Sequence, residues 1–312
     1  MIISASRRTD IPAFYLDWFI NRLKAGEFMY RNPMFPQNVS TMKVTPETVD
    51  CIVFWTKNGE RVINRLNEIN SLGYEKIMFQ YTITGYDGNI EKNVPNIEDR
   101  IFTFKRLSQK LGQEAMTWRY DPIMYGRNNN GKIFDEAFHI KYFEYICRKI
   151  AGHTQRCVFS FLDLYSRSQA NMRHLAIQAP NDEEIDSLVS KMSVIANEYG
   201  IELMTCSEPM NLSKFGIAKS CCIDSKQIGN YIGYELLNLK DKGQRKECGC
   251  IESVDVGMYN CCLHDCVYCY ATYVGNLARE TASKHDKNSP LLLGNLQDGD
   301  VIKERIIRNL RK

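Results

Sequence analysis

Short apolar runs alternate with amphipathic segments along most of this chain. The runs are rich in β-branched and aromatic residues, as the buried strands of a parallel sheet are, and they cover residues 2–5, 51–55, 76–83, 115–123, 156–164 and 201–206. Between them, apolar side chains recur at helical spacing, as in Leu16, Phe19 and Leu23 or in Ile185, Leu188 and Met192. This alternation predicts an α/β fold built on a parallel sheet.

The number of strand-helix units indicates how the sheet is arranged. Residues 253–259 form one more expected strand after the six above. Seven such units favour a (β/α) barrel that is closed or partly open. We expect residues 1–206 to supply the strand-helix units, 207–282 to complete the barrel, and 283–312 to form an extension ending in a basic helix over residues 300–312, all within one integrated domain.

Cysteine is abundant, with 12 residues in a chain of 312. The first residues show no charged start followed by an apolar run and a cleavage site, so we expect a cytoplasmic protein with reduced thiols. Metal binding then explains the cysteines better than disulfide bridges do. No apolar run approaches the roughly 18 residues of a membrane span. The formal net charge is only +3, so it gives faint support for nucleic acid binding. A small-molecule substrate is therefore the favoured expectation.

The most specific motif is Cys262-x3-Cys266-x2-Cys269. Three thiolates on a short loop can each bind one iron of a cubane [4Fe–4S] cluster and leave the fourth iron open to another ligand. Zinc is the competing interpretation, since His264 inside the loop could serve as a further ligand.

This loop resembles the cluster loop of radical S-adenosylmethionine (SAM) enzymes, on the cysteine spacing, on Tyr268 before the third cysteine and on residues 270–272 that follow. Residues 248–271 also resemble an uncharacterised bacterial and archaeal family, DUF1848, whose cysteines have been likened to that cluster. The resemblance implies a [4Fe–4S] cluster, SAM, and a barrel of radical SAM type. Because the loop lies near the chain end, the implied barrel is circularly permuted; a separate cysteine-rich domain is the alternative.

Polar residues at the predicted strand ends are the candidates for binding SAM. Charge-assisted hydrogen bonds from Arg119 and Lys57 suit its carboxylate, and the other candidates are Thr82, Thr84, Ser160 and Asp163 for the ribose, with Arg7 and Tyr268 nearby. Residues 118–123 also resemble a short segment of spore photoproduct lyase, a radical SAM enzyme.

Further cysteines precede the loop, and a second [4Fe–4S] cluster is the economical interpretation. Its expected ligands are Cys206, Cys222, Cys248 and Cys250, with Cys221 or Cys261 in reserve. Buried cysteines that merely pack in the core are the alternative.

Three functional hypotheses follow. The first is a radical SAM enzyme that cleaves SAM reductively and starts radical chemistry on an organic substrate, with ferredoxin or flavodoxin as reductant. The second transfers an aminocarboxypropyl group from SAM. The third is a non-catalytic iron–sulfur protein that carries electrons.

Overall fold

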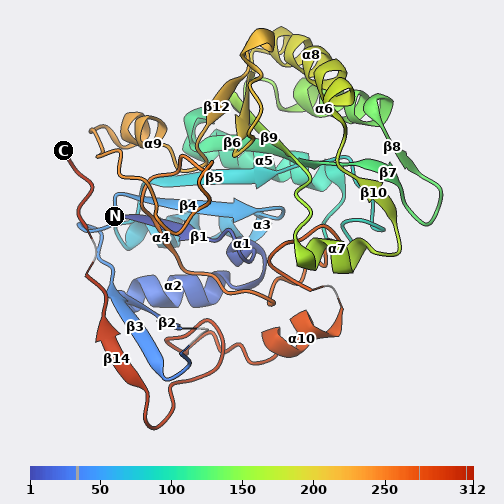
Figure 1. The fold of residues 1–312 in the computed structure, drawn as a ribbon. Coiled ribbons are helices and arrows are strands. Elements are labelled where there is room, and N and C mark those ends of the chain that lie inside the picture. The colour runs from blue at the N-terminus through green and yellow to red at the C-terminus, as the bar shows by residue number, and fades with distance from the viewer. Residues whose placement is uncertain (33–34, 274, 307) are drawn as a thin grey trace.

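One large parallel sheet organises the molecule, in a computed structural model that describes residues 1–32, 35–273, 275–306 and 308–312 (Figure 1). Among these residues, eight strands pair in the order β12-β11-β9-β6-β5-β4-β1-β13, and each pair is parallel. The strands are β1 Ile2–Ala5, β4 Cys51–Thr56, β5 Ile77–Thr82, β6 Met116–Ile123, β9 Arg156–Phe161, β11 Glu202–Cys206, β12 Ala218–Ser220 and β13 Val254–Asp255. The predicted parallel α/β sheet is confirmed.

The prediction of a permuted radical SAM-type barrel, closed or partly open, is wrong. The sheet is open, with β12 at one edge and β13 at the other. Closing a barrel requires edge strands long enough to pair with each other at a fixed stagger, but β12 has three residues and β13 has two. The predicted strand over residues 253–259 shrinks to β13, which does pair in parallel with β1 through Ile3 and Val254.

Helices cover one face of this sheet. Side chains of β1, β4, β5 and β6 that point to that face, such as Ile3, Phe54, Phe79 and Trp118, form the main core with side chains of α2, α5, α6 and α8. The helices are α1 Ile11–Phe14, α2 Leu16–Ala25, α3 Glu60–Ile63, α4 Leu66–Ser71, α5 Ile97–Leu111, α6 Glu136–Ile150, α7 Ser166–Met172, α8 Asp182–Glu198, α9 Ser225–Ile232 and α10 Asn276–Ala282, with short 3₁₀ turns at Gln113–Ala115 and Ser213–Phe215.

The helix boundaries follow local signals. Asn181 caps α8 in a reciprocal capping box with Glu184, which contributes about 1 kcal/mol to helix stability. Gly112 follows α5 with a φ of 91°, a backbone angle that glycine adopts without strain. No helix in the described part of the chain is long and apolar enough to cross a membrane.

Two small sheets lie outside the main one (Figure 1). One contains β2 Glu27–Arg31, β3 Asn38–Lys43 and β14 Val301–Glu304, and the other contains β7 Tyr125–Arg127, β8 Ile133–Phe134 and β10 Ala176–Gln178. The predicted terminal helix over residues 300–312 is therefore wrong at its start, because β14 pairs in parallel with β3. A segment of four residues is too short for its apolar spacing to distinguish a strand from a helix.

The opposite face of the large sheet is covered by the chain between β12 and β13. Ile2, Val53 and Met78 point to this face and pack against Ile228 and Ile232 of α9. Polar side chains also point to it near the strand ends, and Trp55 Nε1 donates to Ser4 Oγ at 3.1 Å. This face therefore combines a small apolar core with polar groups that adjoin the cysteines.

Candidate functional site

Four of the predicted ligands meet where β11 and β12 end. Cys206 closes β11 and Cys222 follows β12, and their Sγ atoms lie 2.8 Å apart. Cys250 is hydrogen-bonded to both Cys222 and Cys248, and it also accepts from the Ile223 amide at 3.4 Å. We call Cys206, Cys222, Cys248 and Cys250 the four-cysteine group. Residues 44 positions apart in the chain thus form one contiguous set of thiols.

Cys221, a reserve ligand in the sequence analysis, lies beside this group. Its Sγ packs so closely on the turn between Cys248 and Cys250 that a Cβ atom on Gly249 would stand 2.5 Å from it. Real Cβ contacts are not that short, so the turn requires glycine here for close approach. The other reserve residue, Cys261, is buried and lies elsewhere, where its thiol donates to the Met258 carbonyl.

Two arginines face the four-cysteine group. Arg119 Nη1 donates to Cys222 Sγ at 2.9 Å, and its other nitrogens hold both oxygens of Asp121. The guanidinium groups of Arg7 and Arg119 lie 5.0 and 5.4 Å from the ring centre of Trp55, within the range of a cation–π interaction. Each arginine thus has an aromatic contact and a thiol neighbour.

Arg7 has a donor left over. Its Nη2 atom is buried and has no hydrogen-bond partner among the described residues. Burial alone would lower the pKa of Arg7, but the negative charges of Cys250 and Asp255 outweigh burial and raise it. Both oxygens of Asp255 already accept two hydrogen bonds each, from Ser4, Ser6 and the amides of Arg7 and Gly257. Arg7 Nη1 donates to Ser253 Oγ at 3.4 Å, and the Cys250 thiol is a further acceptor beside the guanidinium.

The four thiols share protons unequally. The hydrogen bond from Cys222, together with Arg119, lowers the pKa of Cys206 to about 6. Interactions with Cys222 and Cys248 likewise lower the pKa of Cys250. The same interactions raise the pKa of Cys222 and of Cys248. These interactions favour ionisation of Cys206 and Cys250 over ionisation of Cys222 and Cys248, next to two guanidinium groups.

The thiols are not yet spaced around a metal. In the part of the chain that the structure describes, no three Cys, His, Asp or Glu side chains have the geometry to hold a metal ion as they stand. Four sulfurs at 2.3 Å from one zinc ion lie about 3.8 Å from each other, further apart than the 2.8 Å between Cys206 and Cys222. Metal binding would therefore have to separate this pair.

The second group of thiols lies on the loop after β13, which we call the Cys262 loop, residues 262–269. The loop is fixed to the segment after β5. The backbone of Cys266 pairs with Glu91, the Val267 amide donates to the Ile90 carbonyl at 3.0 Å, and the Asn93 amide donates to the His264 carbonyl at 3.0 Å. These contacts hold the three cysteines in a defined loop.

The three thiols of this loop are close enough to influence one another. Burial raises the pKa of Cys262, Cys266 and Cys269, and the charge of Cys269 adds to the rise at the other two. Lys57 acts in the opposite direction on Cys266 and Cys269. The role of these three cysteines as cluster ligands stays a prediction, and Lys57 is a cation beside two of them.

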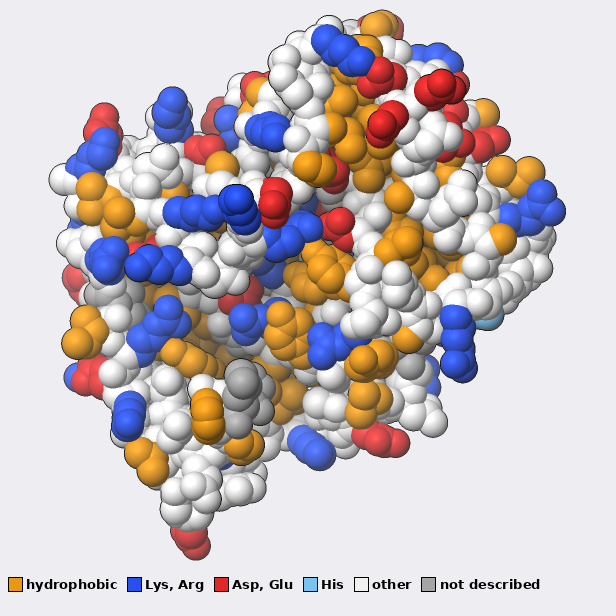
Figure 2. Space-filling model, viewed as in Figure 1, with side chains coloured by type: hydrophobic (Ala, Val, Ile, Leu, Met, Phe, Trp, Pro, Cys, Tyr) orange, Lys and Arg blue, Asp and Glu red, His pale blue; other side chains and the backbone are white. Residues whose placement is uncertain are grey.

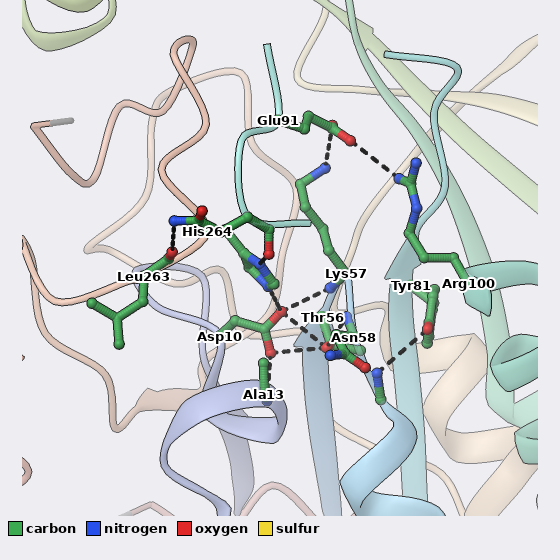
Figure 3. A network of polar contacts seen from close by, with 12 residues as sticks. Asp10, Ala13, Thr56, Lys57, Asn58, Tyr81, Glu91, Arg100, Leu263 and His264 are labelled. Atoms are coloured by element: carbon green, nitrogen blue, oxygen red, sulfur yellow. Dashed lines mark hydrogen bonds and ion pairs between the residues drawn. The ribbon is translucent and has the colours of Figure 1, made fainter. Parts of the chain in front are cut away.

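A buried ion network supports this cation (Figure 3). Lys57 Nζ lies 2.9 Å from Glu91 Oε1, and Arg100 Nη1 lies 3.2 Å from Glu91 Oε2. Burial alone would raise the pKa of Glu91, but the charges of Lys57 and Arg100 lower it to about 2. Thr84 donates to the same carboxylate at 2.8 Å, and the Tyr268 hydroxyl also donates to it. The network fixes Lys57 beside the loop.

Asp10 ties the loop to the strand ends (Figure 3). It caps α1 by accepting from the Ala13 amide at 2.9 Å, and it accepts from the Lys57 amide and from His264 Nε2, both at 2.8 Å. His264, weighed above as a zinc ligand, is thus hydrogen-bonded to Asp10. Neither Asp10 nor Glu91 was among the predicted site residues.

The remaining predicted residues lie at different places. Arg119 belongs with the four-cysteine group, and Lys57, Thr84 and Tyr268 meet at Glu91 beside the Cys262 loop. Thr82 and Ser160 are half-buried at strand ends, and Asp163 is exposed and pairs with Arg245. The roles assigned to them in SAM binding stay predictions.

Exposed tyrosines and arginines surround the Cys262 loop. The Arg167 guanidinium lies 5.0 and 5.2 Å from the ring centres of Tyr259 and Tyr273, and Arg8 lies 5.1 Å from that of Tyr259. Tyr270 packs on Tyr165 with 5.7 Å between ring centres. Figure 2 shows Lys and Arg side chains beside exposed apolar and aromatic ones across the middle of one face. Such a rim suits a planar or anionic molecule.

The fold and the site together define an α/β protein with two groups of cysteines beside an open parallel sheet. The chain matches the family described as Domain of unknown function (DUF1848) over residues 2–271, and it belongs to that family. The matched range includes every cysteine of the four-cysteine group and of the Cys262 loop.

No curated protein matches the chain. Among solved structures, it is similar to a crystal structure of a putative alpha-L-fucosidase from Bacteroides thetaiotaomicron VPI-5482, with 10% sequence identity and a TM-score of 0.28. That similarity covers 65% of this chain and 55% of the other, so this chain spans little more than half the length of that structure. A likeness this weak carries no argument about function.

Proposed function

We propose that this protein is a radical SAM enzyme that cleaves SAM reductively at a [4Fe–4S] cluster on the Cys262 loop. The observation that carries the proposal is the placement of Cys262, Cys266 and Cys269 together on one anchored loop, with Lys57 beside two of them. Three cysteines on one loop and a neighbouring cation are the types of residue that an iron–sulfur cluster with one iron open to a charged ligand requires.

Each group near the loop has a task that its contacts support. The three thiolates would hold the cluster, which, when bound, supplies the electron that breaks a carbon–sulfur bond of SAM. Lys57 is held by Glu91 and lies 5.5 Å from the ring centre of Tyr268, so its ammonium is positioned to bind the SAM carboxylate. Glu91 is itself buried, so the ion pair that holds Lys57 is shielded from solvent. The protein's contribution is to bind and shield the reacting groups.

The surroundings support a small organic substrate. The rim of Arg8, Arg167 and exposed tyrosines at the loop suits a planar or anionic molecule. The half-exposed Tyr270 directly follows Cys269, so the rim and the loop form one surface. A reduced ferredoxin or flavodoxin would supply the electron.

Anaerobic turnover tests the proposal. The protein, reconstituted with iron and sulfide and reduced with dithionite, should convert SAM to 5′-deoxyadenosine and methionine. Cys266→Ala should abolish this product, whereas Cys147→Ala, which removes a buried thiol of α6, should retain it. Methylthioadenosine in place of 5′-deoxyadenosine would support aminocarboxypropyl transfer and overturn the proposal. Intact SAM in a preparation that contains the cluster would indicate an electron-transfer protein.

A further inference from the structure

The four-cysteine group is separate from the loop that would bind SAM. Its members come from the ends of β11 and β12 and from the turn at residues 248–250, whereas the Cys262 loop follows β13. The two groups adjoin through Arg7. Its guanidinium faces Cys250, and its backbone carbonyl accepts from the Tyr270 hydroxyl at 2.8 Å, next to Cys269.

We propose that Cys206, Cys222, Cys248 and Cys250 hold a second [4Fe–4S] cluster that is ligated by four cysteines and stabilised by Arg7 and Arg119. Cys206 and Cys222 are in direct contact at 2.8 Å, Cys222 accepts from Arg119, and Cys250 accepts from the Ile223 amide next to Cys222 in the chain. This inference goes beyond the proposed function, because it requires neither SAM nor the Cys262 loop.

The buried arginines argue against cysteines that merely fill space. Burying a guanidinium group without an anionic partner costs several kcal/mol. Asp121 compensates Arg119. The charge of Asp255 partly compensates Arg7, but the Asp255 oxygens accept from other donors, and Arg7 Nη2 has no hydrogen-bond partner among the residues described. An anionic cluster beside Cys250 would add to the negative charge near Arg7 and would offer Nη2 an acceptor. Hydrogen bonds to the sulfurs and charges near them set the reduction potential of such clusters.

The ligand pattern favours iron–sulfur over zinc. Four sulfur ligands suit either metal, but zinc sites usually combine two close pairs of ligands with two to four residues between the members of a pair. Here two isolated cysteines, Cys206 and Cys222, combine with one pair that has a single residue between its members. Binding would require Cys206 and Cys222 to separate, and Cys206 is the half-exposed member of the pair.

Metal analysis of matched variants tests the proposal. The full chain with Cys262, Cys266 and Cys269 all replaced by Ala, reconstituted anaerobically, should retain about four iron and four sulfide per chain. Adding Cys222→Ser and Cys250→Ser should reduce both to background, while adding Cys157→Ala, a buried thiol of β9, should not. One zinc per chain without iron in the triple variant, or no metal at all, would overturn the proposal.

Two further variants keep the test decisive if the double replacement does not fold. Cys206→Ser changes only the half-exposed member of the group and should lower iron in the triple-Ala background. Arg119→Gln should keep the iron and make the reduction potential of this centre more negative, because a positive charge is removed near the sulfurs. The surface variant Arg61→Gln should leave the potential unchanged. Unchanged iron in the Cys206→Ser variant together with an unchanged potential in the Arg119→Gln variant would contradict the assignment.

Discussion

At the scale of single residues, buried polar groups in this protein are stabilised by specific partners. Glu91 is compensated by Lys57 and Arg100, and Asp10 by four donors that include His264. Removing one partner of such a buried pair typically costs 3–5 kcal/mol. These residues are therefore as important for holding the cysteines in place as the apolar core is.

His139 provides a pH test of this principle away from the cysteines. Its ring is fully buried, Nε2 lies 3.0 Å from the Met124 carbonyl, and Nδ1 lies 3.1 Å from the Tyr120 hydroxyl. Burial lowers the pKa of His139 to about 4. The unfolded chain binds a proton below about pH 6.5 and the folded chain does not, so stability falls as pH decreases from about 6.5 to 4. Over this pH range His139 should reduce the free energy of unfolding by about 3 kcal/mol.

Chemical denaturation at pH 7.5 and pH 4.5 measures this effect. His139→Gln should be less stable than the parent at pH 7.5, but it should lose less stability between the two pH values because glutamine does not titrate. An equal loss in parent and variant would show that His139 does not contribute to the pH dependence.

Sequence alone identified the thiols better than it identified their partners. Cys262, Cys266 and Cys269 follow a motif, and Cys206, Cys222, Cys248 and Cys250 follow from their number and position. Glu91 and Arg100 carry no motif, because their role arises only when the segment after β5 folds against the Cys262 loop. Arg119 was expected to bind SAM, which stays a prediction, and the sequence did not indicate that its side chain contacts Cys222 and Asp121.

At the scale of elements, the turn at Cys248–Gly249–Cys250 is sterically restricted. Because a Cβ on Gly249 would stand 2.5 Å from Cys221 Sγ, Gly249→Ala should destabilise the protein by about 1–3 kcal/mol and lower the iron held by the four-cysteine group. Thermal unfolding and iron analysis in the triple-Ala background measure the two effects.

The matched control is Gly243→Ala, whose Cβ would meet only the exposed end of Asp241 at 3.2 Å and should change neither quantity. Combining Gly249→Ala with Cys221→Ala should restore iron, since the second change removes the colliding sulfur. Loss of iron in Cys221→Ala alone would show instead that Cys221 is a ligand.

Elements with a strong periodic pattern were predictable, and those defined by their partners were not. The strands from β1 to β11 in the large sheet and helices α2, α5 and α8 match the apolar spacing closely. β12 has three residues and forms by pairing with β11, and β13 has two residues and forms by pairing with β1. β14 forms because β3 offers an edge to it, which a local pattern cannot indicate.

At the scale of the whole molecule, the open sheet determines where the chemistry lies. Most helices pack on one face, and the chain after β11, including α9, returns over the other face (Figure 1). Cys206 and Cys222 therefore lie at the ends of β11 and β12, and the Cys262 loop follows β13. A closed barrel would have brought β12 and β13 together. Here the space between these edges is filled by α9 and the four-cysteine group instead.

The two proposed centres differ in one respect, because only the one on the Cys262 loop has an iron open to SAM. Electron paramagnetic resonance of the reduced protein, recorded with and without SAM, distinguishes them. One signal should disappear when Cys262, Cys266 and Cys269 are all replaced by Ala, and SAM should shift this signal in the parent protein. The signal that remains in the variant should be the same with and without SAM. A loop signal that SAM does not affect, or a shift of the four-cysteine signal, would contradict an open iron on the Cys262 loop alone.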